Sequence, residues 1–138
     1  GCLEVLQWVL TAGRFPADPH ALDGAVMLIE TSEMLPSASE VGWVLRAMGE
    51  RGLLAAVDAV LVARPLASSL EDRRDAPARA RFRAEQRDVV IETVGRYNPE
   101  AVICVGVPFG HTRPQWILPH GGTMTLDGVS RRITASYA

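Results

Sequence analysis

The sequence has few cysteines, no long apolar run and no excess of either charge, and each absence excludes a class of protein. Its 2 cysteines, Cys2 and Cys104, provide neither a disulfide framework nor the spacing of a metal site. No apolar run approaches the roughly 18–20 residues that a bilayer span needs, and no segment resembles a signal peptide. We therefore expect a cytoplasmic protein, with no membrane partner and with two buried free thiols.

The charge pattern argues against a nucleic-acid partner. The formal net charge is −2, and the arginine cluster near residues 73–87 is interleaved with acidic residues, which is typical of a solvated helix face. Hydrophobic residues make up 48% of the chain and charged residues 22%, so a folded core is expected. We treat residues 1–138 as one domain, since this length suits a single core.

Short apolar runs alternate with amphipathic segments over most of the chain. Buried strands are predicted at residues 25–29, 58–63 and 101–107, the first of them a central strand. Helices are predicted at residues 3–10, between Ser37 and Gly52, and from about 78 to 97. Residues 14–24 and 66–78 are expected to be connections, the second of them mobile. This alternation predicts an α/β domain with a small, mainly parallel sheet and flanking helices.

Two local motifs refine this prediction. Ser37 and Glu40 fit a capping box at the start of the second helix, and Gly52 fits a left-handed cap at its end. Near the C-terminus, residues 121–135 alternate with period two around Asp127-Gly128. We therefore expect an antiparallel hairpin with a tight type I′ turn, added to the parallel sheet.

The strongest candidate for chemistry pairs Glu30 with His111. Glu30 directly follows the first predicted strand, and His111 follows Pro108 and Gly110 at the end of the third. The carboxyl ends of parallel strands share one sheet edge, where ligands bind, so the two side chains are expected to meet there. A carboxylate can hold a histidine base in its tautomer and stabilise its cation. The structural alternative is a loop histidine that hydrogen-bonds a nearby carbonyl group.

No nucleophile, metal site or cofactor site accompanies this pair. None of the serines lies in a Gly-x-Ser-x-Gly elbow. The three histidines, His20, His111 and His120, lack the spacing of metal ligands, so we expect no metal and no cofactor. Trp43 and Trp116 could stack on a nucleobase, but their surroundings predict core positions.

Four segments carry a resemblance to a known family: residues 1–6, 26–33, 59–65 and 107–121, with the blocks Ile-Glu-Thr-Ser-Glu and Gly-His-Thr-Arg-Pro as the most specific. They resemble the C-terminal domain of the LD-carboxypeptidase family, and are most similar to the branch that contains the microcin C immunity peptidases. The resemblance implies a serine peptidase with a Ser-Glu-His triad, in which Glu30 is the acid and His111 the base. Glu33, three residues further on, is the alternative acid.

The resemblance also implies where the missing parts lie. The nucleophilic serine and the oxyanion hole would belong to an N-terminal domain, a partner that residues 1–138 do not include, so this chain alone is expected to be inactive. The implied fold is a swivelling β/β/α domain. The separation 111 − 30 = 81 is longer than the family leads us to expect, and the arginine-rich helix with its preceding loop holds the excess.

The implied substrates are murein peptides, cleaved before a terminal D-residue, or peptidyl- and aminoacyl-nucleotide antibiotics in the immunity branch. A homodimer is expected, as is an apolar face that a partner domain would cover. An alternative of another class is a non-catalytic binding or dimerisation domain. In that case Glu30 and His111 would form a structural ion pair.

Overall fold

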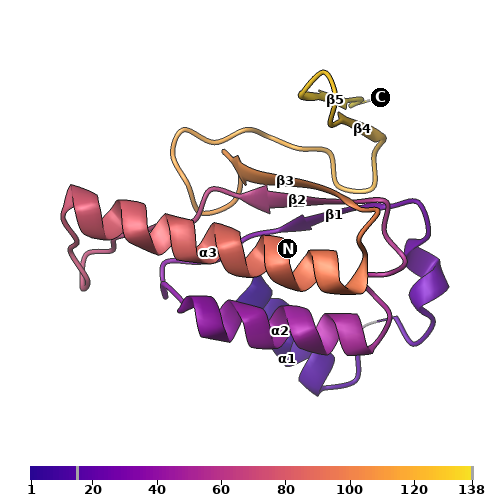
Figure 1. The fold of residues 1–138 in the computed structure, drawn as a ribbon, viewed down its shortest axis with the longest axis horizontal. Helices are drawn as coiled ribbons and strands as arrows, with labels where there is room; N and C mark the ends of the chain where they lie inside the picture. Colours follow the sequence, from indigo (N-terminus) through magenta and orange to yellow (C-terminus); the bar gives the residue numbers. More distant parts are fainter. Residues whose placement is uncertain (15, 138) are drawn as a thin grey trace.

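The computed structural model describes residues 1–14 and 16–137, in which a parallel sheet separates a layer of helices from a β-hairpin (Figure 1). Its elements are α1 (Leu3–Thr11), the 3₁₀ helix η1 (Pro19–Leu22), β1 (Val26–Ile29), α2 (Ala38–Glu50), β2 (Ala59–Ala63), α3 (Ala76–Tyr97), β3 (Val102–Val107), β4 (Met124–Asp127) and β5 (Arg132–Ala135). The predicted α/β class is therefore confirmed. No helix in the described ranges combines the length and the apolar character needed to cross a membrane.

The three parallel strands are ordered β1-β2-β3. Ala59 of β2 lies between Val26 of β1 and Val102 of β3, so β2 is the central strand. The prediction that residues 25–29 form a central strand is wrong, because a short apolar run indicates burial but carries no information about which strands lie beside it. On the outer side of β1, the first residues of the chain form an isolated parallel bridge, between Cys2 and Glu30 just beyond the strand.

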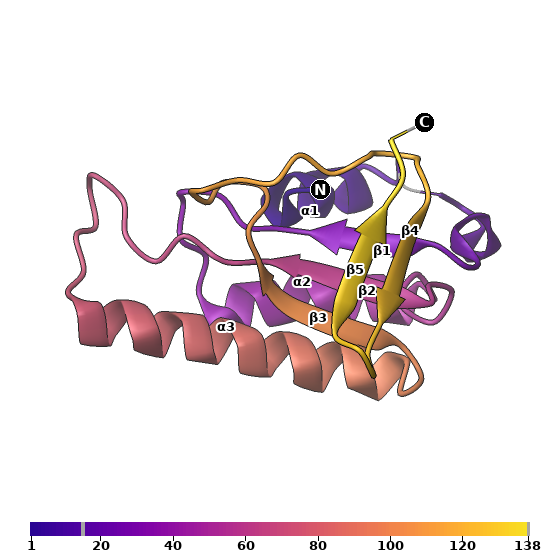
Figure 2. The ribbon, with the colours of Figure 1, turned by 90° about the horizontal axis from the view of Figure 1, so that it is seen from above.

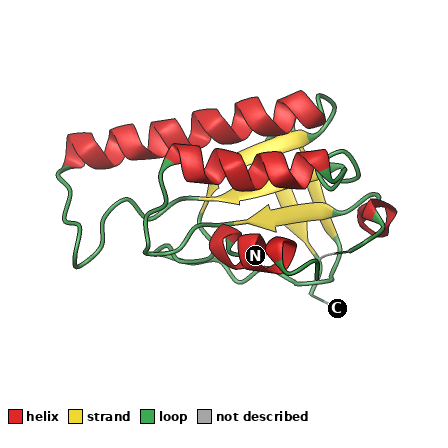
Figure 3. Cartoon of the chain, turned by 90° about the horizontal axis from the view of Figure 1, so that it is seen from below, coloured by secondary structure: helices red, strands yellow, loops and turns green. Residues whose placement is uncertain are grey.

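Successive residues of β2 point into two different cores. Val60 is fully buried in the core between the sheet and helices α2 and α3, which also contains Leu45 and Val94. Leu61 is fully buried on the other face, in the core that the hairpin covers. Viewed from above, β4 and β5 cross over the sheet, and viewed from below, the helices cover its opposite face (Figures 2 and 3). Both faces of the sheet are thus covered, as expected for parallel strands.

Helix α2 begins at the predicted capping box. The Ser37 hydroxyl accepts a hydrogen bond from the Glu40 N–H at 3.2 Å, and the Glu40 carboxylate accepts one from the Ser37 N–H at 2.7 Å. Gly52 follows the helix with a φ of +75°, the left-handed conformation expected of its cap. Val41, Val44, Leu45 and Met48 lie at the spacing of one helix face and form a buried apolar stripe.

Helix α3 begins earlier than predicted. The Asp75 side chain accepts a hydrogen bond from the Ala78 N–H at 2.8 Å, and Pro77 lies in the first turn, where its missing N–H costs nothing. The last residues of the predicted connection 66–78 are therefore helical. The predicted connection 14–24 similarly contains the 3₁₀ helix η1, at Pro19–Leu22.

Two further predictions need correction. Asp127 pairs with Arg132, so the hairpin loop covers residues 128–131 and is longer than the two-residue type I′ turn. Asp127 stabilises this loop, because its carboxylate accepts hydrogen bonds from the N–H groups of Val129 and Ser130. The free thiols Cys2 and Cys104 are partly buried rather than fully buried.

Candidate functional site

Glu30 and His111 meet at the carboxyl edge of the parallel sheet. Glu30 directly follows β1, and His111 lies in the loop after β3. Oε2 of Glu30 is 2.9 Å from Nδ1 of His111, and it also accepts a hydrogen bond from the His111 backbone N–H at 2.7 Å. The structure thus brings together the two residues that the sequence singled out, although 81 positions separate them.

Gly110 makes this contact possible. Its φ is +70°, and a Cβ atom at this position would lie 1.7 Å from Oε2 of Glu30. The space that a side chain would fill is therefore occupied by the carboxylate. The requirement for glycine here is both conformational and steric.

Glu33 approaches the other nitrogen of the same ring. Its Oε2 lies 3.5 Å from Nε2 of His111, and its side chain is 68% exposed, against 14% for Glu30. Glu30 is thus a nearly buried partner that fixes Nδ1, whereas Glu33 reaches Nε2 from solvent. This geometry favours Glu30 over Glu33 as the carboxylate that orients the ring.

The two carboxylates change the acidity of the histidine. The hydrogen bond that Glu30 accepts raises the pKa of His111 above its usual value, partial burial opposes this, and the negative charges of Glu30, Glu33 and the more distant Glu4 add to the rise. The imidazolium form is therefore more stable here than in an unperturbed histidine. A base whose cation is stabilised in this way is suited to accept a proton during a reaction.

We predict that the Glu30→Gln substitution lowers the pKa of His111, because it removes the hydrogen bond that contributes most to the rise. An NMR titration of the imidazole in both forms of the chain measures this change.

The raised pKa also makes the contact stabilise the folded chain at low pH. This contribution is complete below the unfolded-state pKa of about 6.5 and is lost as the pH rises through the higher folded-state pKa. An unchanged His111 pKa in Glu30→Gln would contradict both the predicted fall in that pKa and this dependence of stability on pH.

The loop that carries Glu30 and Glu33 is held in place by Glu4 of α1. One oxygen of the Glu4 carboxylate accepts hydrogen bonds from the Ser32 N–H at 2.9 Å and from the Ser32 hydroxyl at 2.8 Å. Its other oxygen accepts one from the Cys2 thiol at 3.0 Å. Sequence reasoning missed this support, since nothing in the spacing connects α1 to the residues after β1.

Arg64 connects the end of β2 to the loop of His111. Its Nε donates to the Thr112 hydroxyl at 3.1 Å, and its Nη2 donates to the Arg113 carbonyl at 2.6 Å. Sequence reasoning also missed this residue. It follows a parallel strand directly, as Glu30 does, so the argument that found Glu30 would have found Arg64 as well.

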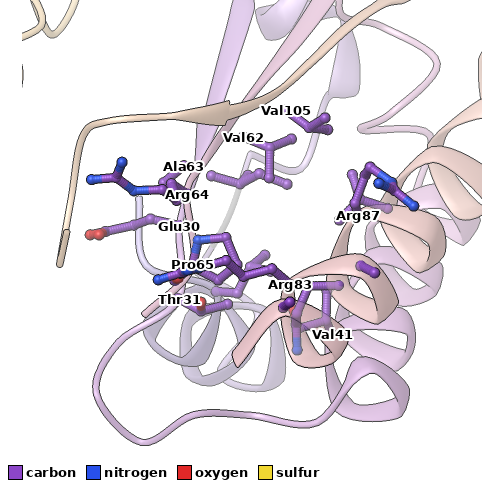
Figure 4. Close-up of a pocket in the computed structure, with 17 residues that line it drawn as sticks. Glu30, Thr31, Val41, Val62, Ala63, Arg64, Pro65, Arg83, Arg87 and Val105 are labelled. Atoms are coloured by element: carbon purple, nitrogen blue, oxygen red, sulfur yellow. The ribbon is translucent and has the colours of Figure 1, made fainter. Parts of the chain in front are cut away.

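An apolar cavity of about 490 Å³ opens at the same sheet edge, between the strands and α3. Val62 and Val105 line it from the sheet, and Arg83 and Arg87 line it from α3 (Figure 4). Glu30 is part of its lining. A second pocket, of about 480 Å³, contains His111 in its lining. A ligand at the Glu30–His111 pair therefore has apolar space next to it.

The other candidates from the sequence are all exposed: His20, His120, Trp43 and Trp116. His20 is exposed in η1, with Nδ1 3.1 Å from Oδ2 of Asp23. Within the described ranges, no group of three or more histidine, cysteine and acidic side chains could hold a metal ion. The prediction that Trp43 and Trp116 are core residues is wrong, because their exposed fractions are 66% and 51%.

Comparisons with known proteins agree with this architecture. The family model of the LD-carboxypeptidase C-terminal domain matches residues 1–126. A crystal structure of the MccF-like protein from Streptococcus pneumoniae, in complex with AMP, shares the fold with a TM-score of 0.74 and 21% sequence identity. The match covers 99% of this chain but 39% of that chain. A comparison with curated proteins gives no match.

Proposed function

Because the chain belongs to the LD-carboxypeptidase C-terminal domain family, we propose that it supplies the acid and the base of a Ser-Glu-His triad in a serine carboxypeptidase. The observation that carries this proposal is the 2.9 Å contact between Oε2 of Glu30 and Nδ1 of His111. A catalytic histidine needs such a partner to hold it in the correct tautomer.

In the proposed reaction, Nε2 of His111 accepts the proton of the nucleophilic serine as its oxygen attacks the scissile carbonyl. The same nitrogen then donates the proton to the departing amine. Glu30 holds the proton on Nδ1 and stabilises the imidazolium ion that forms in between. The serine and the oxyanion hole would come from an N-terminal domain, which is consistent with this chain spanning only 39% of the length of its structural relative.

The first proposed substrate is a murein peptide, hydrolysed at the L,D bond before its terminal D-residue. The family match supports this choice, because its description names the LD-carboxypeptidases. A second candidate is a peptidyl- or aminoacyl-nucleotide conjugate. It is favoured by the AMP bound in the MccF-like relative and by the exposed indole of Trp116, five residues after His111, which is free to stack on a base.

The test compares the wild type with His111→Ala in the full-length protein. Each is incubated with a murein tetrapeptide and, separately, with an aminoacyl-sulfamoyl adenylate, and the products are identified by mass spectrometry. Release of D-alanine that the substitution abolishes is expected. His20→Ala is the matched control, since it removes an exposed histidine that contacts Asp23 rather than Glu30.

Each other outcome changes the assignment. Cleavage of the adenylate alone would move the substrate to nucleotide conjugates while keeping the triad. If neither substrate gives a product that depends on His111, the result favours the non-catalytic alternative. In that case Glu30 and His111 form a structural ion pair.

A further inference from the structure

The pocket next to His111 is unusually basic. It has a volume of about 480 Å³ and is lined by four arginines, Arg64, Arg79, Arg83 and Arg113, together with the side chains of His111 and Thr112. No acidic residue lines it. The arginines come from three parts of the chain: the end of β2, the first half of α3 and the loop after β3.

The positive charge of this pocket is not neutralised by carboxylates. Among the described residues, none of its four arginines has a carboxylate oxygen within 4.0 Å. Burial, with the neighbouring charges of Arg64 and Arg79, lowers the pKa of the Arg83 guanidinium. Three arginines of α3 and its preceding loop, in contrast, are paired: Arg74 with Asp72, Arg87 with Asp88 and Arg96 with Glu92.

The guanidinium groups of Arg64 and Arg83 are held in position by neutral oxygens. Arg64 donates to the Thr112 hydroxyl and the Arg113 carbonyl, as described above. Nε of Arg83 donates to the Pro65 carbonyl at 3.2 Å. These hydrogen bonds orient the side chains but leave their charge uncompensated. Such a pocket is organised for an anion before the anion arrives.

We propose that this arginine pocket binds an oxyanion group of the substrate, a carboxylate or a phosphate, while the scissile bond lies at His111. The planar guanidinium group matches both oxyanions through paired hydrogen bonds. Arg64 and Arg83 also line the apolar cavity, so the ligand combines an anionic group with an apolar part. The identification of the ligand as the substrate rests on the proposed function, whereas the binding of an anion by the pocket does not.

The pocket's position suits this role. His111 is part of its lining, while Glu30 and Glu33 contact the ring nitrogens of His111 without lining the pocket. Arg64 is joined by its hydrogen bonds to the two residues that follow His111. An anion bound by Arg64 is therefore held beside the proposed base. Positioning of this kind fixes the reacting bond relative to the base.

The test measures anion binding to the 138-residue chain directly, without any turnover. Inorganic phosphate and N-acetyl-D-alanine are titrated separately by calorimetry, and the Arg side-chain N–H signals are followed by NMR in the wild type. We expect saturable binding that moves the signals of Arg64, Arg79 and Arg83. The Arg79→Gln/Arg83→Gln variant is expected to bind at least about tenfold more weakly, because it loses two charged donors.

The matched control is Arg73→Gln/Arg81→Gln, which removes the same charge from exposed residues of the same region that do not line the pocket. It should keep the wild-type affinity within about twofold, a difference expected from screened long-range charge alone. Tighter binding of phosphate would identify the substrate's oxyanion as a phosphate group. Tighter binding of N-acetyl-D-alanine would identify it as a peptide carboxylate. No saturable binding, or equal losses in the two variants, would overturn the proposal.

The proposed function can fail separately from this inference. If His111→Ala leaves turnover intact while phosphate still moves the signals of the pocket arginines, the triad assignment falls and the anion site stands. If turnover depends on His111 but neither anion binds, the anion site falls alone. The wild-type NMR signals give this answer even if an arginine variant does not fold.

Discussion

Replacing Glu30 by glutamine is expected to lower the kcat of the full-length protein by about 10⁴-fold. This is the loss typical of a triad whose histidine is held in the wrong tautomer. The Glu30 carboxylate accepts hydrogen bonds from both the backbone N–H and the ring Nδ1 of His111. A glutamine amide that turns its NH₂ group toward Nδ1 would move the ring proton to Nε2. That nitrogen could then no longer accept the serine proton. Steady-state kinetics on the proposed murein peptide measure the effect.

Glu33→Gln is the natural control for this prediction. Glu33 lies 3.5 Å from Nε2 and is largely exposed, so its removal is expected to change kcat by less than about tenfold, as for a weak solvent-exposed ion pair. A large loss in Glu33→Gln, together with near-normal turnover in Glu30→Gln, would make Glu33 the triad acid. The alternative that the sequence left open would then be correct.

Gly110→Ala is expected to break the contact between Glu30 and His111. The added Cβ would lie 1.7 Å from Oε2 and 2.4 Å from Cδ of Glu30, so the carboxylate must move away. Misplacement of a catalytic group by about 1 Å can cost roughly 10² in rate. A non-glycine residue in the left-handed region also destabilises the fold by about 1–2 kcal/mol. Turnover, the His111 pKa and thermal unfolding measure the three effects.

Gly13→Ala separates the backbone cost from the steric one. Gly13 has a φ of +64°, close to the +70° of Gly110, but a Cβ atom there meets nothing within 4 Å. We expect a comparable loss of stability in both variants, and a lowered His111 pKa and turnover only in Gly110→Ala. Normal turnover in a folded Gly110→Ala variant would show that the Glu30 contact is dispensable.

The elements of the fold could be predicted from local patterns, but the arrangement of the sheet could not. The apolar stripe after Ser37 and the capping box are local signals, and the structure contains both. The position of β2 between β1 and β3 depends on pairing between segments distant in sequence, which no window of the sequence records. The hairpin loop differs from the prediction. Asp127-Gly128 is typical of a two-residue turn, whereas here the side chain of Asp127 stabilises a longer loop.

The site divides in the same way. Glu30 and His111 could be predicted to meet, because each follows a strand of one parallel sheet, and the structure places them in contact. The arginine pocket could not be predicted. Arg79 and Arg83 are one helical turn apart on α3, which from sequence is typical of a solvated face. Their role appears only when the segments carrying Arg64 and Arg113 pack beside that helix.

The central strand β2 and the arginine pocket differ in how freely their residues can change during evolution. Every position of β2 except Val62 is buried, and neighbouring positions face different cores, so a polar replacement at almost any of them would destabilise one layer or the other. Arg83, in contrast, is exposed on α3 and Arg79 is half-buried there, so substitutions at these positions affect folding less. The lineage of this domain can therefore alter the charge of its pocket, and with it the choice of ligand, while the strands that position Glu30 and His111 stay constant.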